Sequence, residues 1–278
     1  KQKEQTISLL NEIPMLEPRQ TYAYVREHPN DMKWIWSVLA EYEMEWKLAT
    51  CKELCQVCYI KKPHPRLQAF QFFDPAIPSE NRVKSSIQIQ NGISHSLVTG
   101  PNKGGKSSAL RALCLNVWLA QTVGFAFADA FSLTPFSWIE SGLRLADTPG
   151  SESLFEREIQ FTTNILNKAK SGTRGIVFYD ELFHSTNPPD GEKTASIFLS
   201  HLWKYPNVVS FISTHVFTIV DSAPQEVQRL CVLANETETG LNYTFRLAPG
   251  ICKVSSVQEI YKKFGFPLSA VKRKNDSG

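Results

Sequence analysis

Continuous apolar runs occur at residues 96–99, 175–179 and 208–213. Such runs are typical of central strands in a parallel sheet, where other elements cover both faces. Between them, apolar residues recur at helical spacing over residues 108–123, about 153–170 and about 192–203. This alternation predicts an α/β fold with a mixed, largely parallel central sheet flanked by helices.

The regions on either side of this core show other patterns. Residues 31–59 carry apolar residues at helical spacing without proline or glycine, so we expect a long helix that ends before Pro63 and Pro65. Residues 66–91 form short extended pieces that could make an antiparallel flap, and 228–234 with 242–247 predict a hairpin. We therefore expect a helical segment at 1–65 and a larger domain at 66–278, with two short helices between residues 255 and 274.

Composition limits the class of protein. With 278 residues, 42% of them hydrophobic, the chain can bury one sizeable core and a smaller appendage. The net charge of +3 permits contact with nucleic acid but does not argue for it. No apolar run approaches the roughly 20 residues of a membrane span, and no signal peptide is visible, so we expect an intracellular protein (cytoplasm, nucleus or organelle) without membrane contact. Because the first residue is Lys1, we expect a piece of a longer protein.

Three of the six cysteines, Cys51, Cys55 and Cys58, lie close together, with His64 nearby. Their spacing can hold zinc or an iron–sulfur cluster. The same positions also share one face of a helix, and no second pair of cysteines follows. We therefore favour reduced cysteines that pack within a helix over a metal site.

The strongest local signal is the glycine-rich stretch LVTGPNKGGKSSA, which follows the first apolar run. It spaces Gly100, Gly105, Lys106 and Ser107 as G-x-x-x-x-G-K-S, the phosphate-loop pattern. Glycines let backbone N–H groups surround phosphate oxygens, the lysine brings a positive charge to the β and γ phosphates, and the serine hydroxyl can bind Mg²⁺. The helix that follows presents unpaired N-terminal amides to the same anion. We interpret the stretch as a nucleotide site rather than a chance glycine turn.

Polar side chains follow the two other apolar runs. Asp180 and Glu181 end the run at 175–179, and His215 comes just after the run at 208–213. Strand ends face the ligand crevice in open α/β sheets. Asp180 there can hold Mg²⁺ and Glu181 can polarise the attacking water, the two further tasks of nucleotide hydrolysis. His215 could orient the γ-phosphate.

Two weaker candidates complete the site. Ser151 or Ser153 can cap the helix that continues to about residue 170, and such a hydroxyl can instead face the γ-phosphate of a neighbouring subunit. Arg82 or Val83, in the extended region before the phosphate loop, could touch the adenine.

Taken in this order, the motifs resemble those of the MutS family of DNA mismatch-repair ATPases, within the ABC-type ATPases. The resemblance covers roughly residues 66–265 and includes the segments TGPNKGGKSS, SLFERE, DELFHSTNPPDG and STH. It implies a P-loop NTPase fold that uses ATP and Mg²⁺, with Mg²⁺ at Ser107 and Asp180. It also implies that Glu181 activates water, that His215 reads the γ-phosphate, and that Ser153 acts in the site of a partner subunit. The residues implied in ATP binding are Gly100, Pro101, Asn102, Lys103, Gly104, Gly105, Lys106, Ser107 and Ser108.

The resemblance further implies a DNA-dependent ATPase that forms a homodimer or heterodimer with a second MutS-like subunit. Residues 1–65 would match the end of the family's lever arm, and 255–278 its dimerisation region. The DNA would be mismatched; alternatives are a MutS-like ATPase acting on recombination junctions, branched DNA or ribosomes, or a non-hydrolysing, nucleotide-gated dimerisation module. Phe183 and His184 stand where the family usually has Gly and Arg, and Pro188 and Pro189 are expected to stiffen the next loop, so the subfamily and the coupling between sites stay open.

Overall fold

The computed structural model describes residue 26 and residues 29–62, 64–89, 92–101, 103–143, 153–237, 240–253, 261 and 264. The chain divides into two compact units after Lys52. The expected helices between residues 255 and 274 lie outside the described residues, apart from Tyr261 and Phe264. The same holds for most of the first 28 residues of the expected N-terminal helical segment.

The N-terminal unit contains one described helix, α3 (Pro29–Thr50). An ion pair of 2.7 Å joins Glu43 to Lys47 one turn later, and the Thr50 hydroxyl donates to the Trp46 carbonyl oxygen at 2.8 Å. The predicted helix is therefore present up to Thr50, but the prediction is wrong for residues 54–59, which form strand β1 (Leu54–Tyr59). Helical spacing in the sequence does not reveal the distant strands that pair with β1.

The larger unit is built on a six-stranded sheet in the order β11, β10, β4, β9, β8, β7. Its parallel strands are β4 (His95–Thr99), β7 (Trp138–Gly142), β8 (Gly175–Tyr179), β9 (Val208–Ser213) and β10 (Gln228–Thr237). At one edge β11 (Gly240–Pro249) returns antiparallel to β10, as the hairpin prediction requires. The predicted mixed, largely parallel central sheet is confirmed.

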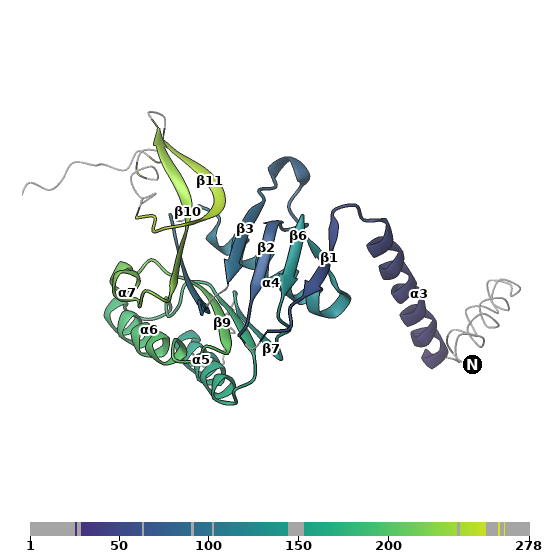
Figure 1. Ribbon diagram of the computed structural model, residues 1–278, viewed down its shortest axis with the longest axis horizontal. Helices are drawn as coiled ribbons and strands as arrows, with labels where there is room; N and C mark the ends of the chain where they lie inside the picture. Colours follow the sequence, from purple (N-terminus) through teal and green to yellow (C-terminus); the bar gives the residue numbers. More distant parts are fainter. Residues whose placement is uncertain are drawn as a thin grey trace, which may run out of the picture. The chain divides into compact units, whose positions relative to one another are not determined.

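Helices cover both faces of this sheet (Figure 1). The helix α4 (Lys106–Val123) packs on one face, and α5 (Leu154–Lys170), α6 (Pro188–Leu202) and α7 (Phe217–Ser222) pack on the other. Successive side chains of a strand point to opposite faces, so in β8 Ile176 and Phe178 join the core with α4, while Val177 and Tyr179 join the core with α5 and α6. Burial on both faces explains the continuous apolar runs.

A second sheet lies beyond α4, which contacts strands of both sheets. Its order is β3, β2, β6, β1, β5, and only the pair β1 and β6 is parallel. Its other strands are β2 (Leu67–Phe72), β3 (Ser85–Ile89), β5 (Phe125–Phe127) and β6 (Ala130–Leu133). A short 3-10 turn, η2 (Ser79–Asn81), lies between β2 and β3. The extended pieces expected at 66–91 do pair antiparallel, as β2 and β3, and they belong to this five-stranded sheet.

Two local predictions need correction. Cys55 and Cys58 lie in β1, so the interpretation of the three cysteines as one helical face is wrong. Pro188 and Pro189 do not stiffen a loop but occupy the first two positions of α6, where their missing N–H groups leave no helical hydrogen bond unmade. The Asn187 side chain caps this helix by accepting from the Asp190 N–H at 3.1 Å.

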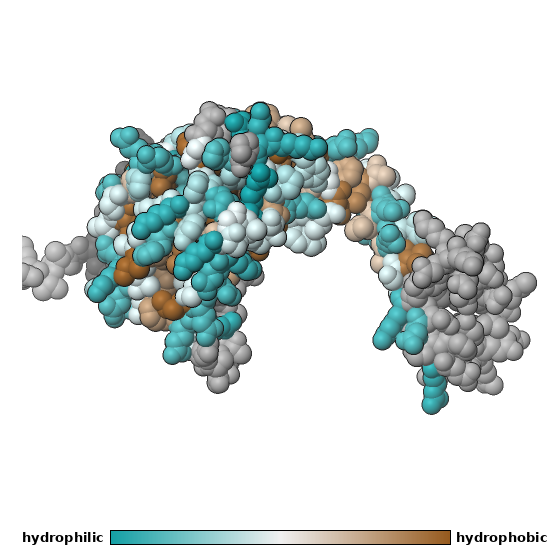
Figure 2. Space-filling view, turned by 60° about the horizontal axis from the view of Figure 1, so that its bottom comes forward, coloured by the Kyte–Doolittle hydropathy of each residue, from teal (hydrophilic) through white to brown (hydrophobic). Residues whose placement is uncertain are grey.

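On the face shown in Figure 2, the hydrophobic residues of the larger unit form small separate patches among hydrophilic ones. Scattered exposed apolar residues of this kind are normal for a globular surface. Within the described part of the chain, no helix is both long and apolar enough to cross a bilayer.

Acid is expected to destabilise the fold through His95. This side chain is buried in β4, where its Nδ1 lies 2.9 Å from Ser210 Oγ, and burial lowers its pKa from 6.5 to about 4. The unfolded chain therefore takes up this proton at a higher pH than the folded chain. The free energy of unfolding should therefore not be reduced by His95 above pH 6.5. It should fall as the pH drops toward 4, by about 3 kcal/mol in total.

Urea unfolding at several pH values checks this expectation. His95→Asn should lower the stability at neutral pH but weaken its dependence on pH in that window, because the titrating group is gone. A variant with the same pH dependence as the parent chain would contradict the assignment.

Candidate nucleotide-binding site

The loop between β4 and α4 has the geometry that its glycines predict. Gly105 has a φ of 99°, and a β-carbon there would lie only 3.0 Å from Phe245 Cδ1. The Gly104 N–H donates to the Pro101 carbonyl oxygen at 3.0 Å and closes the turn. Helix α4 then begins at Lys106, so its free N-terminal amides lie at the loop. Asn102 lies outside the described residues.

Lys106 is buried, with 4% of its surface exposed. Its Nζ donates to the carbonyl oxygens of Gly100 at 2.9 Å and Pro101 at 3.2 Å. Burial lowers the pKa of Lys106, and the carboxylates of Glu181 and Asp180 oppose that effect. The loop therefore holds its lysine ammonium close to the two carboxylates that follow β8.

Asp180 and Glu181 are held by Ser213, the last residue of the neighbouring strand β9. The Ser213 hydroxyl donates to Asp180 Oδ1 at 2.5 Å and accepts from the Glu181 N–H at 2.8 Å. Parallel strands end at the same edge of a sheet, which brings these residues together. Sequence reasoning missed Ser213, although it begins the quoted segment STH.

The predicted His215 lies next to Glu181. Its Nε2 is 3.7 Å from Glu181 Oε1, and both side chains are partly exposed. Glu181 has a φ of 56°, an unfavourable conformation for a residue with a side chain. Strained residues of this kind occur often at functional sites.

A cavity of about 300 Å³ lies between the phosphate loop and Glu181. It is lined by Pro101, Lys103, Gly105, Lys106, Ser107, Ser108, Glu181 and Phe245. The structure thus brings the phosphate loop and one of the two predicted carboxylates into one space. Sequence reasoning also missed Phe245, because this aromatic ring comes from β11, far along the chain.

Ser107 and Asp180 offer a hydroxyl and a carboxylate oxygen, the kind of ligand that Mg²⁺ prefers. A Mg²⁺ ion in a nucleotide site takes its other ligands from phosphates and water, so two protein ligands fit this chemistry. Among the described residues, no three His, Cys, Asp or Glu side chains are grouped as a metal site. The donor set therefore suits a metal that arrives with a nucleotide.

The remaining predicted residues do not line this cavity. Ser153 caps α5: its hydroxyl accepts from the Glu156 N–H at 3.2 Å, while the Glu156 carboxylate accepts from the Ser153 N–H at 2.8 Å. Arg82 lies over the Phe73 ring and forms an ion pair of 2.6 Å with Glu53. Val83 is the next residue along the chain, and contact of either residue with adenine stays a prediction.

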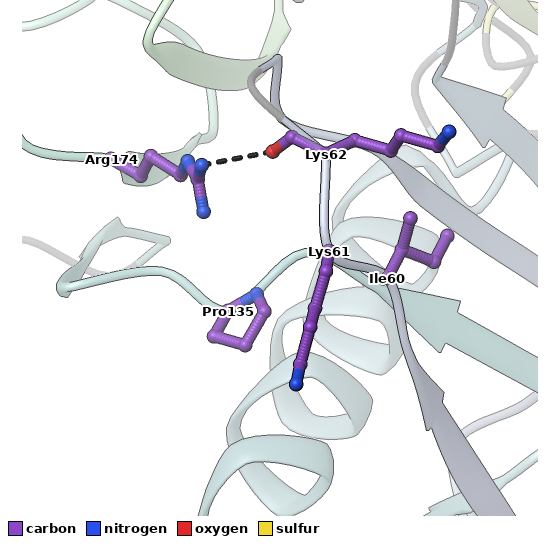
Figure 3. A pocket seen from close by; sticks show the side chains of 5 residues that line it. All are labelled: Ile60, Lys61, Lys62, Pro135 and Arg174. Atoms are coloured by element: carbon purple, nitrogen blue, oxygen red, sulfur yellow. Dashed lines mark hydrogen bonds between the residues drawn. The ribbon is translucent and has the colours of Figure 1, made fainter.

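A second cavity, of about 380 Å³, is lined by Ile60, Lys61, Lys62, Pro135 and Arg174 (Figure 3). The Arg174 guanidinium donates to the Lys62 carbonyl oxygen at 2.9 Å. The side chains of Lys61 and Lys62 point in different directions (Figure 3). The cationic groups do not converge on one point, so we assign no ligand to this cavity.

Comparison with known proteins identifies the family. Residues 96–277, which contain the loop, both strand ends and the hairpin, match MutS domain V. The chain belongs to the MutS family. The resemblance noted in the sequence is thereby confirmed.

Individual MutS relatives align with about two thirds of this chain. It is 31% identical to the DNA mismatch repair protein MSH6 of Arabidopsis thaliana over 64% of the chain and 14% of that protein. It is also 31% identical to the DNA mismatch repair protein MutS of Thermus thermophilus, over 64% of the chain and 22% of that protein. The chain therefore spans less than a quarter of the length of these relatives, and the α/β architecture described above agrees with membership of the family.

Proposed function

We propose that this chain is the ATP-binding and hydrolysing domain of a MutS-like DNA mismatch-repair protein, with a P-loop NTPase fold of the ABC type. The observation that carries the proposal is that the phosphate loop and Glu181 line the same cavity. A triphosphate held by the loop would bring its γ-phosphate toward Glu181 and His215.

Each group has a proposed task. Loop N–H groups and the Lys106 ammonium bind the phosphates, while Ser107 and Asp180 hold Mg²⁺, which neutralises phosphate charge when bound. Glu181 accepts a proton from the attacking water, and His215 donates to the γ-phosphate. Phe245, which lines the same cavity, would contact the nucleotide, and Arg82 and Val83 remain candidates for the adenine contact.

We further propose that the active form is a homodimer or heterodimer with two composite sites. Ser153 does not line the cavity of its own chain, and it stands exposed at the N-terminus of α5, where backbone amides favour an anion. In this proposal Ser153 contacts the γ-phosphate of the partner subunit. Residues 255–278 would form the dimerisation region, and residues 1–65 the end of a lever arm.

The DNA partner is proposed from the relatives, whose names describe DNA mismatch repair proteins. ATP binding and hydrolysis would switch the binding of mismatched DNA by segments of which most lie outside this chain. An intracellular location follows from the same proposal.

ATP binding and turnover of the 278-residue chain test the proposal. We expect Mg²⁺-dependent ATP binding and a turnover per chain that rises with the fraction of dimer, because each site needs a partner. ATP binding without turnover at any dimer fraction would favour the dimerisation module, and a chain that does not bind ATP would overturn the proposal. Heteroduplex, homoduplex and four-way-junction DNA added to the same assay separate a mismatch response from a response to branched DNA.

A further inference from the structure

A buried carboxylate lies next to the segment that carries Glu181. Glu158, in the second turn of α5, has 1% of its side chain exposed. Its oxygens accept hydrogen bonds from the Tyr179 hydroxyl at 3.3 Å and from the Ser185 hydroxyl. A carboxylate is costly to bury unless hydrogen bonds satisfy its oxygens, and these two hydroxyls satisfy the oxygens of Glu158.

The partners of Glu158 stand on both sides of Glu181 in the sequence. Tyr179 ends β8, and its phenol O–H donates to a Glu158 carboxylate oxygen, which can accept. Ser185 follows Glu181 by four residues. The carboxylate thus holds both ends of the short segment at 179–185.

His184 lies between Glu158 and the backbone of Glu181 and contacts both. Its Nδ1 lies 2.9 Å from the Glu181 carbonyl oxygen and 3.6 Å from Glu158 Oε1. A carbonyl oxygen can only accept, so Nδ1 carries the proton in this hydrogen bond. With Ser213 on the Glu181 N–H, both backbone groups of Glu181 are held.

The backbone of this segment needs such support. Glu181 and Phe183 have φ values of 56° and 54°, which are unfavourable for residues with side chains. The Phe183 ring packs against Phe155, one turn before Glu158 on α5, with ring centroids 6.0 Å apart. Two side chains of α5 therefore hold a strained segment in place.

We infer that Glu158 is a positioning residue for Glu181: through Ser185, Tyr179 and His184 it keeps the segment 181–185 in the conformation that directs the Glu181 carboxylate into the nucleotide cavity. The inference rests on the proposed ATPase function. It assigns to α5 a task within its own subunit, separate from the task proposed for Ser153 in the partner's site.

Substitutions that remove or restore the hydrogen bonds test the inference. Glu158→Met keeps a side chain of similar length but leaves Tyr179 and Ser185 without their acceptor, and Ser185→Ala removes one bond and disturbs the core less. We expect Glu158→Met to lower ATP turnover about tenfold with ATP affinity within about twofold of the parent, because a displaced catalytic group affects the reaction more than binding. Ser185→Ala should lower turnover less. Glu158→Gln should restore much of the loss, since its amide can accept from Tyr179 and donate to Ser185.

Hydrogen exchange supplies a readout that needs no turnover. The amides of residues 181–185 should exchange faster in Glu158→Met and Ser185→Ala, while the rest of the sheet exchanges as in the parent. Glu226→Met, at an exposed position before β10, is the matched control and should change neither measurement. If Glu158→Met does not fold, turnover and hydrogen exchange in Ser185→Ala test the inference instead.

The outcomes separate this inference from the proposed function. Unchanged turnover and unchanged exchange in Ser185→Ala and Glu158→Met, while Glu181→Gln loses turnover, would overturn the positioning task of Glu158 alone. Unchanged turnover in Glu181→Gln as well would overturn the water-activating role proposed for Glu181, whereas a chain that does not bind ATP would overturn the proposed function. In a chain that shows no turnover, unchanged exchange at 181–185 would overturn the inference.

Discussion

Lys106→Ala is expected to weaken ATP binding by about 100-fold or more, because charge-assisted hydrogen bonds to phosphate are among the strongest in proteins. The Lys106 ammonium is buried beside the phosphate loop and donates hydrogen bonds of 2.9 and 3.2 Å to two of the loop's own carbonyl oxygens. A phosphate group could therefore replace those carbonyls as its partner without moving the helix. Binding of a fluorescent ATP analogue with Mg²⁺, measured by anisotropy, gives the affinity.

The control for Lys106→Ala must separate loss of the site from loss of the fold. Lys193→Ala removes an exposed lysine on α6 and should bind ATP as the parent chain does. Lys106→Ala also leaves the carbonyl oxygens of Gly100 and Pro101 without this donor, so thermal unfolding should accompany the binding assay. Parent-like affinity in a folded Lys106→Ala chain would contradict the whole assignment of the site.

Local patterns sufficed for most of the central sheet and for the phosphate loop. The strands β8 and β9 are buried on both faces, so their apolar runs are visible without knowledge of their neighbours. The loop is equally local, because the φ of Gly105 and the start of α4 depend on adjacent residues. Asp180, Glu181 and His215 could be placed at one edge because parallel strands end together.

Features that depend on distant pairing could not be predicted in this way. Residues 54–59 continue a helical spacing, yet they form β1 because β5 and β6 supply hydrogen-bond partners from residues 125–133. Phe245 reaches the cavity only because β11 folds back beside β10. The contacts of Glu158 likewise need α5 to pack against β8 before they exist.

The packing around Phe183 shows how the fold accommodates a side chain at a position with positive φ. The resemblance implies Gly at the position of Phe183, and the positive φ of Phe183 is the conformation that glycine adopts readily. The Phe183 ring is buried between Phe155 and Phe198, so packing offsets the cost of that backbone conformation. The carbonyl oxygen of Phe183 lies 2.5 Å from where a β-carbon of Gly191 would be, so α6 can approach the segment only with glycine there.

Glu181→Gln is expected to bind ATP within about twofold of the parent and to lose about 100-fold or more in turnover, the contribution of a positioned general base. The amide has the size of the carboxylate, and the hydrogen bond from the Glu181 N–H to Ser213 belongs to the backbone, so the segment should keep its conformation. What is lost is an oxygen that can take a proton from water, together with the charge that faces His215 at 3.7 Å. Single-turnover hydrolysis of ATP, with binding measured in parallel, separates the two effects.

Two further variants test whether the loss of turnover is specific to the Glu181 carboxylate. Glu226→Gln makes the same chemical change at an exposed position and should hydrolyse ATP at the parent rate. His215→Gln removes the neighbouring imidazole but leaves the carboxylate, so its turnover should fall less than that of Glu181→Gln if the carboxylate is the base. A larger loss of turnover in His215→Gln than in Glu181→Gln would indicate that the histidine is the principal catalytic group. Parent-like hydrolysis in Glu181→Gln would reject water activation by this carboxylate.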